Sequence, residues 1–121
     1  IYGKYAEKNR NLTFEEIESK IKDGIPYVVR LRSSGTPGKD AKHIEVNDEI
    51  RGTLSMPENF QDVIILKSIG IPTYHFAHVI DDHLMRTTHV VRGEEWLMSL
   101  PIHIELYEKL GRLYTAIRLS C

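Results

Sequence analysis

Residues 73–97, TYHFAHVIDDHLMRTTHVVRGEEWL, decide the fold that this sequence predicts. Apolar side chains in the first half of the stretch recur at helical spacing, and Thr73 precedes them where an N-cap belongs. Residues 88–92 are rich in β-branched side chains and predict a short strand, which Gly93 ends. The stretch therefore predicts a helix, a strand and a tight turn, in that order.

A second helix is expected after the turn, from Glu94 to Leu110, with a step at Pro101 and an end at Gly111. Helix, strand, turn and helix make half of a parallel α/β unit. Such a half leaves one edge of its sheet uncovered. We therefore expect the chain to self-associate through the exposed half-sheet or to be partly disordered.

Upstream, the pattern changes to that of an α+β module. Residues 1–11 are polar and predict a loop, whereas Thr13 and Glu16 form a capping box that starts a helix. This helix carries an apolar stripe of Phe14, Ile17 and Ile21, and it ends near Gly24. Further segments are expected as strands at 27–32, 44–50, 53–56 and 63–66, with a turn or flexible loop at 33–38.

Composition excludes several classes of protein. The 121 residues are 41% hydrophobic and 27% charged with a net charge of −1, so any RNA contact must be a local patch. The chain lacks the roughly 20-residue apolar run of a membrane span. Cys121 is the only cysteine, which fits a reducing cytoplasm. The cations of the first half are either solvated surface or an RNA-backbone contact: Lys20, Lys22, Arg30, Arg32, Lys39 and Lys42.

The first candidate site follows the strand at 88–92, because open α/β sheets bind ligands beyond the carboxyl ends of their strands. Arg92 can fork onto a carboxylate or phosphate. Glu95 can accept from hydroxyls or an amine, and Trp96 offers a flat face to a base. The alternative is structural, with Arg92 in a surface ion pair, Glu95 favouring the helix dipole and Trp96 in the core.

A second candidate lies within the first helix of the stretch. His75, His78 and Asp82 share one helix face and suggest a zinc site, and with it a small metal-dependent hydrolase. The alternative, polar helix surface, is favoured because nothing else in the sequence supplies a second shell. His43, His89 and His103 are scattered and are interpreted as structural.

Three segments together carry a resemblance to a known family. Residues 70–85 (GIPTYHFAHVIDDHLM), 88–97 (THVVRGEEWL) and 100–103 (LPIH) closely resemble glutamyl-tRNA synthetases, which are class I aminoacyl-tRNA synthetases. Upstream pieces agree in order: RNLT at 10–13, VRLR at 29–32 and VIILKS at 63–68. The resemblance extends through about Gly111, and so long a collinear match is far more specific than one short motif.

The resemblance implies an α/β fold in two parts. Residues 1–72 would form an inserted α+β domain that binds the tRNA acceptor end. Residues 73–121 would form the second half of a Rossmann-type catalytic domain, with 112–121 as a tail outside the family pattern. The implied reaction activates glutamate with ATP and Mg²⁺ to glutamyl-adenylate, then transfers it to the 3′ end of tRNA(Glu).

The resemblance also implies roles for individual residues. Tyr74 and Arg92 match positions that hold the substrate glutamate, as does His78, where some members have Asn. Glu95 matches an ATP-side position. Trp96 lies near the acceptor terminus, and Lys67 is a weaker candidate for the acceptor strand.

Departures from the family pattern matter as well. The His-x-Gly-His motif, the Lys-Met-Ser-Lys-Ser loop and the anticodon-binding domain are absent, so we expect an internal fragment that cannot complete the reaction alone. Some relatives bind zinc in the inserted domain through cysteines, but Asn9 stands at one such position. We therefore predict no zinc and no other protein-held metal.

The tail at 112–121 differs from the family, and a shifted reading frame would restore the family pattern, so a frame slip is our hypothesis for it. Two alternative functions stay open. One is the shorter paralogue that glutamylates a modified tRNA base, against which Glu94-Glu95-Trp96 argues. The other is a stand-alone RNA-binding module, against which the near-neutral charge argues.

Overall fold

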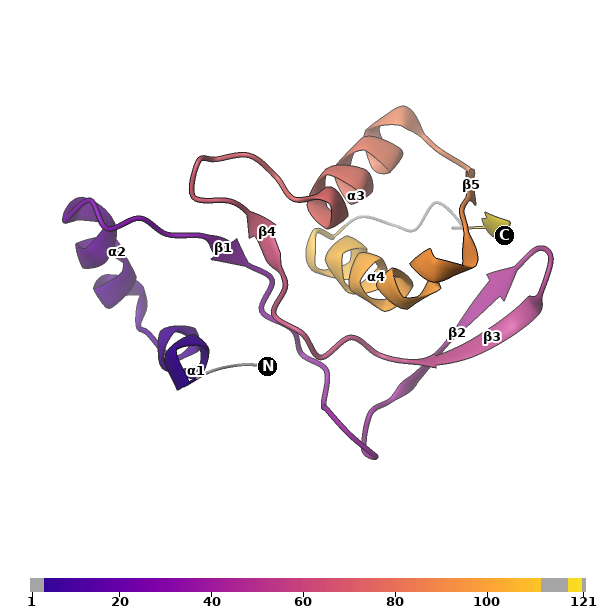
Figure 1. Cartoon of the computed structure of the whole chain (residues 1–121), viewed down its shortest axis with the longest axis horizontal. Coiled ribbons are helices and arrows are strands. Elements are labelled where there is room, and N and C mark those ends of the chain that lie inside the picture. Colours follow the sequence, from indigo (N-terminus) through magenta and orange to yellow (C-terminus); the bar gives the residue numbers. More distant parts are fainter. Residues whose placement is uncertain (1–3, 112–117, 121) are drawn as a thin grey trace.

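The computed structural model describes residues 4–111 and 118–120, and side chains from Glu7 to Gly111. The frame-slip hypothesis concerns a tail of which 112–117 and 121 lie outside this description. The elements are shown in Figure 1. In chain order they are α1 Lys4–Arg10, α2 Phe14–Lys22, β1 Val29–Arg30, β2 His43–Asp48, β3 Gly52–Pro57, β4 Ile64–Leu66, α3 Tyr74–Met85, β5 His89–Val91, the 3₁₀ helix η1 Glu94–Ser99, α4 Leu100–Lys109 and β6 Arg118–Ser120.

The N-terminal segment departs from the prediction. The sequence predicts a loop for residues 1–11, which is wrong for Lys4–Arg10, because this segment forms α1. Lysine, alanine, glutamate and arginine there are good helix formers, and Lys8 and Arg10 suit the helix C-terminus. The next helix starts as predicted: the Thr13 side chain accepts from the Glu16 N–H, and the Glu16 carboxylate accepts from the Thr13 N–H at 2.8 Å.

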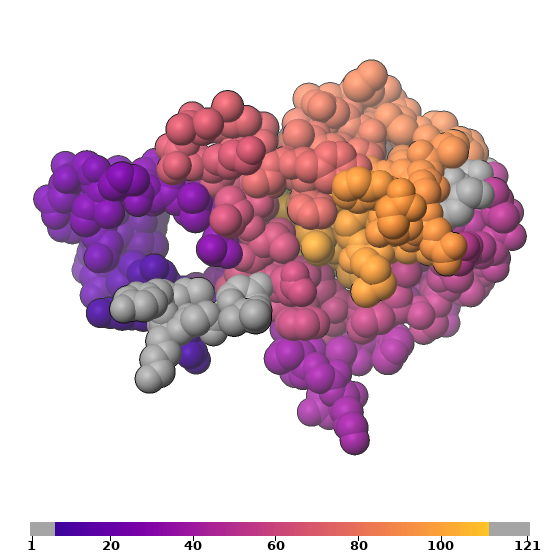
Figure 2. Space-filling model, viewed as in Figure 1, coloured from indigo at the N-terminus to yellow at the C-terminus, as the bar shows by residue number. Residues whose placement is uncertain are grey.

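Helix α2 does not bury its apolar stripe among the described residues. Phe14 is 75% exposed, and Ile17 and Ile21 are also exposed. In the space-filling view the N-terminal helices form a lobe at the left, beside the rest of the molecule (Figure 2). The capping chemistry is therefore sufficient to start this helix, while its apolar side contributes no core.

Two separate sheets organise the strands. Strands β1 and β4 pair antiparallel. The other sheet has the order β3-β2-β6-β5, with an antiparallel β2–β3 hairpin and parallel β2–β6 and β5–β6 pairs. The parallel β5–β6 pair fits the expected α/β half-unit. Self-association through the exposed half-sheet stays a prediction.

The second half follows the predicted boundaries closely. Helix α3 and strand β5 form as expected, and Gly111 ends α4 with a φ of +63°. The step expected at Pro101 is present: the chain runs as 3₁₀ helix to Ser99 and as α-helix from Leu100. Proline in the first turn of α4 has no intrahelical N–H bond to lose.

The main core cluster joins both halves of the chain. Leu31, Val79, Leu106 and Tyr107 are buried together, and Val63, Ile65, Phe76 and Ile102 pack against them. The cluster thus combines side chains in or next to β1 and β4 with side chains of α3 and α4. The division at 72/73 into an inserted and a catalytic part stays a prediction, and these contacts join its two sides.

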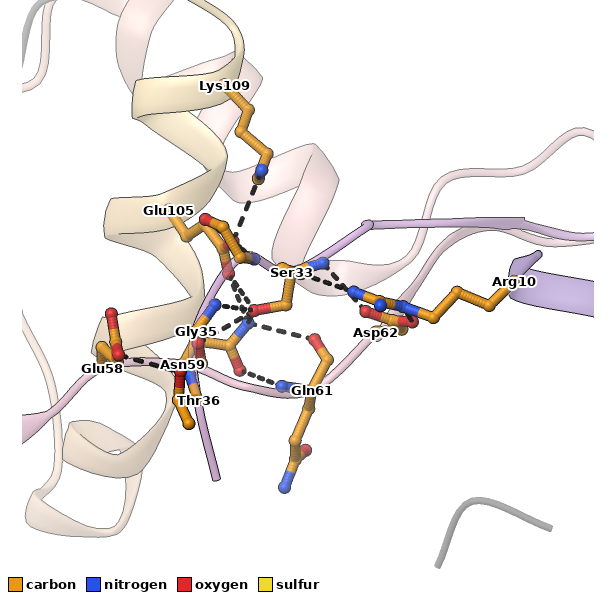
Figure 3. Close-up of polar contacts among 11 residues, drawn as sticks. Arg10, Ser33, Gly35, Thr36, Glu58, Asn59, Gln61, Asp62, Glu105 and Lys109 are labelled. Atoms are coloured by element: carbon orange, nitrogen blue, oxygen red, sulfur yellow. Dashed lines mark hydrogen bonds and ion pairs between the residues drawn. The ribbon is translucent and has the colours of Figure 1, made fainter. Parts of the chain in front are cut away.

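A buried carboxylate reinforces this junction (Figure 3). Glu105 of α4 is 7% exposed and accepts hydrogen bonds from the Ser34 N–H at 2.7 Å and from Asn59 Nδ2 at 2.7 Å. The Ser33 hydroxyl lies 2.9 Å from the same carboxylate, and Lys109 Nζ lies 3.7 Å away. Every neighbour of the carboxylate named here can donate to it.

The network continues outward to α1. Asp62 accepts from the Ser33 N–H at 2.8 Å and pairs with Arg10 Nε at 2.6 Å. Arg10 Nη2 also donates to the Ser33 carbonyl at 2.6 Å. The segment at Ser33 is therefore held from both sides, by α1 and by α4.

Gly35 lies against the same network. A Cβ on Gly35 would lie 1.9 Å from the carbonyl oxygen of Asn59, a backbone atom that cannot rotate away. The sequence predicts the loop at 33–38 from its glycines and proline, and the structure adds a steric reason for glycine at this position. Only a residue without a side chain lets the two backbones approach so closely.

We predict that Gly35→Ala destabilises the chain more than Gly38→Ala. The first substitution forces the backbone away from Asn59, whereas Gly38 has open space around a Cβ and only a φ of +92° to resist it. The left-handed conformation alone costs a non-glycine residue about 1–2 kcal/mol. Urea unfolding of both variants measures the difference. Equal losses would mean that the close approach at Gly35 is absent.

We further predict that Glu105→Gln lowers the free energy of unfolding at pH 7 by about 1–3 kcal/mol, since the new amide would face donors and leave one unsatisfied. Glu45→Gln, at an exposed carboxylate of β2, should change it by less than about 0.5 kcal/mol. Urea unfolding measures both variants.

The difference in the free energy of unfolding between wild type and Glu105→Gln should depend on pH. Burial by itself raises the pKa of Glu105, but hydrogen bonds from Asn59, Ser34 and Ser33 outweigh it and leave the pKa below its ordinary value. A carboxylate with a lowered pKa stabilises the fold above its unfolded-state pKa and loses that contribution as pH falls through the folded-state pKa. The gap between the two proteins should therefore shrink on acidification, and a constant gap would contradict this assignment.

Candidate functional site

The candidate site forms where the end of β5 meets helix α3. Arg92 directly follows β5, and its Nη2 lies 2.5 Å from Nε2 of His78. The guanidinium carbon of Arg92 lies 5.4 Å from the ring centroid of Tyr74. A cation over an aromatic face at this distance is electrostatically favourable. Helix α3 therefore orients the arginine by two side chains one turn apart.

Further ring contacts extend from Tyr74, next to this arginine. Tyr74 stacks on His78, with centroids 5.8 Å apart and an interplanar angle of 12°. Trp96 of η1 lies 5.0 Å from Tyr74, centroid to centroid. The structure thus brings together four residues that the sequence predicts for the site: Tyr74, His78, Arg92 and Trp96.

Two groups that the resemblance did not place in the site also lie here. Asp82 Oδ2 is 2.8 Å from Nε2 of His78, one helical turn away. His103 of α4 is buried, its Nε2 is 3.0 Å from Nδ1 of His75, and its ring centroid is 4.9 Å from that of His78. The four-residue spacing of His78 and Asp82 signalled their contact, whereas no local pattern links His103 to α3.

The three histidines are neutral at pH 7. Burial, followed by the nearby His78, Arg92 and His75, lowers the pKa of His103 to about 3. Burial and then the charge of Arg92 lower the pKa of His75. The same two causes lower the pKa of His78, although Asp82 opposes them. The site therefore offers one permanent cation, Arg92, among uncharged rings.

The two remaining predicted residues lie apart from this group. Glu95 is exposed and folds back over Gly93, where a Cβ would lie 2.4 and 2.5 Å from its carboxylate oxygens. Lys67 is exposed directly after β4, where its N–H donates to the Ile71 carbonyl at 2.9 Å. Among the side chains described from Glu7 to Gly111, neither of these two forms a hydrogen bond or an ion pair with Arg92.

Metal ligands do not gather in the described part of the chain. No group of three or more His, Cys, Asp or Glu side chains there is positioned to hold a metal ion. His78 and Asp82 meet, but His75 turns to His103 instead of joining them. The arrangement gives no support to the metal-dependent hydrolase.

None of the helices described here combines the length and the apolar character that crossing a membrane would require.

Residues 2–119 match the family model described as the catalytic domain of class I tRNA synthetases (E and Q). The chain belongs to the class I tRNA synthetases. This confirms the resemblance carried by residues 70–103, and it makes the fold that of a class I synthetase catalytic domain with mixed helices and strands.

Relatives of this synthetase chain are similar over most of its length. It is 57% identical over 110 residues to the glutamate–tRNA ligase of Acetivibrio thermocellus, covering 91% of this chain and 19% of that protein. The Thermus thermophilus glutamate–tRNA ligase is 46% identical over 110 residues, covering 90% of this chain and 22% of that protein. The chain thus spans about a fifth of the length of these relatives.

A solved synthetase structure agrees. The crystal structure of a glutamate tRNA ligase from Elizabethkingia meningosepticum, in complex with its amino acid, matches with a TM-score of 0.78 and 37% identity. The match covers 94% of this chain and 23% of that one. A second structure, from Elizabethkingia anophelis, matches with a TM-score of 0.75.

We predict that His103 makes the synthetase chain less stable in acid. The pKa of His103 is near 3 in the folded chain and about 6.5 in the unfolded chain. Between these values the unfolded chain binds a proton at His103 that the folded chain does not bind. Stability should therefore fall as pH drops from about 6.5 toward 3. Urea unfolding at pH 7 and pH 5 should show a smaller drop for His103→Asn than for wild type.

The matched control is His43→Asn, at an exposed histidine of β2, which should leave the acid drop unchanged. Equal acid drops in wild type and His103→Asn would show that His103 accepts a proton in the folded chain.

Proposed function

We propose that this chain forms the amino-acid-binding side of the active site of a glutamate–tRNA ligase. The observation that carries the proposal is the position of Arg92 at the carboxyl end of β5, oriented by His78 and stacked over Tyr74. The relatives are named glutamate–tRNA ligases. The reaction that the resemblance implies activates glutamate with ATP and then transfers it to the 3′ end of tRNA(Glu).

Arg92 is the proposed anchor of the substrate. A guanidinium forms two parallel hydrogen bonds to a carboxylate, and such charge-assisted bonds are about twice as strong as neutral ones. The half-buried position of Arg92 limits competition from water. Tyr74 packs against the cation and bounds the space in front of it, while His78 contacts the guanidinium from one helical turn further along α3.

The other predicted residues have roles next to this anchor. Glu95 is proposed to accept from the ribose hydroxyls of ATP, and its exposed carboxylate is accessible to a ligand. Trp96, which is 43% exposed, offers an open ring face to the terminal base of the acceptor end. Lys67 is proposed to contact an acceptor-strand phosphate as a point charge.

At the level of domains, we propose that residues 1–72 belong to the inserted acceptor-binding part and 73–121 to the second half of the Rossmann-type catalytic domain. The partners are then glutamate, ATP and tRNA(Glu), in the cytoplasm. The family also implies Mg²⁺.

The alternatives are less well supported. The relatives are named as glutamate–tRNA ligases, and none of those reported above is a glutamylating paralogue. If the chain were a stand-alone RNA-binding module, Arg92 and the neighbouring side chains of Tyr74 and His78 would have no role. The RNA-binding module predicts no specific binding of glutamate, whereas a glutamylating paralogue would bind glutamate as well.

We predict that glutamate binding changes the fluorescence of Trp96, the only tryptophan, because its ring lies 5.0 Å from Tyr74. Arg92→Gln should weaken binding about tenfold or more, since hydrogen bonds to charged groups contribute about 1.5–3 kcal/mol. Titration of the chain with glutamate, glutamine and aspartate measures this, with glutamate preferred.

The control is Arg32→Gln, which removes an equal charge at an exposed position after β1. Arg32→Gln should bind glutamate as wild type does. Equal binding of glutamate by Arg92→Gln and wild type would exclude Arg92 as the anchor, and no preference among the three amino acids would refute the proposed function.

A further inference from the structure

One nitrogen of the site has two partners with opposite requirements. Nε2 of His78 lies 2.5 Å from Arg92 Nη2 and 2.8 Å from Asp82 Oδ2. Arginine can only donate a hydrogen bond, and an ionised carboxylate can only accept one. A ring nitrogen carries either a hydrogen or a lone pair, so His78 can satisfy only one of the two at a time.

The two choices are the two tautomers of a neutral ring. Burial, followed by the charge of Arg92, lowers the pKa of His78, so the imidazolium form is disfavoured. With its hydrogen on Nδ1, His78 accepts from Arg92 through Nε2. With its hydrogen on Nε2, His78 donates to Asp82. Nε2 then has no lone pair that could accept a hydrogen bond from Arg92.

We propose that Asp82 is a positioning residue. It accepts a hydrogen bond from Nε2 of His78 when a ligand carboxylate accepts the hydrogen bonds of Arg92. This inference rests on the proposed function, because it requires a carboxylate at Arg92. As the carboxylate accepts the N–H groups of Arg92, Nδ1 of His78 gives its proton to water. Nε2 accepts a proton from water and donates it in a hydrogen bond to Asp82, so the net proton count is unchanged.

The groups around His78 leave Asp82 as the acceptor for this role. From α3, Asp81 acts only through its charge, His75 bonds to His103, and Tyr74 stacks on the His78 ring. From α4, His103 lies ring to ring with His78. Among the described side chains, the carboxylate that contacts Nε2 is that of Asp82, which is 18% exposed.

Asp82 therefore compensates for the bond that His78 loses when Arg92 leaves. Without Asp82, a hydrogen on Nε2 of His78 has no acceptor. Arg92 therefore keeps its hydrogen bond to the lone pair of Nε2. Ligand affinity should then fall, although Asp82 itself does not touch the ligand. Coupling between two such groups commonly changes an affinity by about fivefold or more.

The tautomer of His78 is directly measurable by long-range ¹H–¹⁵N NMR of the histidine rings in the full chain, with the His78 signals assigned by their loss in His78→Asn. We expect the Nδ1–H tautomer in the free chain and the Nε2–H tautomer at saturating glutamate. Arg92→Met removes the competing donor, so its free chain should already show Nε2–H. A His78 ring that keeps one tautomer in all three samples would overturn the inference.

Affinity supplies the second test, with Trp96 fluorescence as the readout. Asp82→Ala should weaken glutamate binding about fivefold or more. Asp82→Asn, whose amide oxygen still accepts from Nε2–H, should recover most of the loss. Asp81→Ala removes the same charge one residue away and should bind as wild type. Equal losses of glutamate affinity in Asp81→Ala and Asp82→Ala would show that only the negative charge matters. This outcome would overturn the proposed contact.

The two proposals fail in different ways. Glutamate that binds without changing the tautomer leaves the proposed function standing and overturns the inference. Glutamate that does not bind at all overturns the proposed function and the ligand step together. The competition itself is then decided by Arg92→Met, which must shift the free chain to Nε2–H if Arg92 and Asp82 share the nitrogen.

Discussion

The buried carboxylate of Glu105 is the interaction on which the two halves of this chain depend. It draws the Ser34 N–H and the Asn59 side chain onto α4 and thereby fixes the loop after β1 and the segment before β4. Removing such an acceptor would leave several buried donors unpaired at once, which is far more costly than losing one surface bond. The apolar cluster of Leu31, Leu106 and neighbouring side chains closes over the same junction.

Helix α4 links this junction to the candidate site. Glu105 bonds to the loop after β1, and His103, two residues earlier, bonds to His75 of α3. Both side chains are buried, one as an acceptor of many donors and the other as a neutral ring. The position of α3, and with it of Tyr74 and His78, therefore depends on the same helix that carries the carboxylate.

The parts of the fold that depend on local chemistry could be predicted from the sequence. The capping box of Thr13 and Glu16 and the end of α4 at Gly111 are examples, since each needs only nearby residues. The Glu105 network could not be predicted, because its partners lie 46 to 72 residues away and no short pattern links them. At the site, the resemblance supplied Tyr74 and Arg92, whereas the burial that makes His103 neutral exists only in the folded chain.

The strand order of the larger sheet has a consequence for how the chain folds. Strands β2 and β5 do not pair with each other; each pairs with β6, which follows both in the chain. The hairpin of β2 and β3 can form early from neighbouring residues. The sheet is complete only when β6, from the C-terminal end of the chain, pairs with both β2 and β5. Pairings between distant segments slow folding, since the loop must close before the contacts reward it. Until then the two edges are exposed, and the interval before closure is when the chain is most prone to pair with other chains.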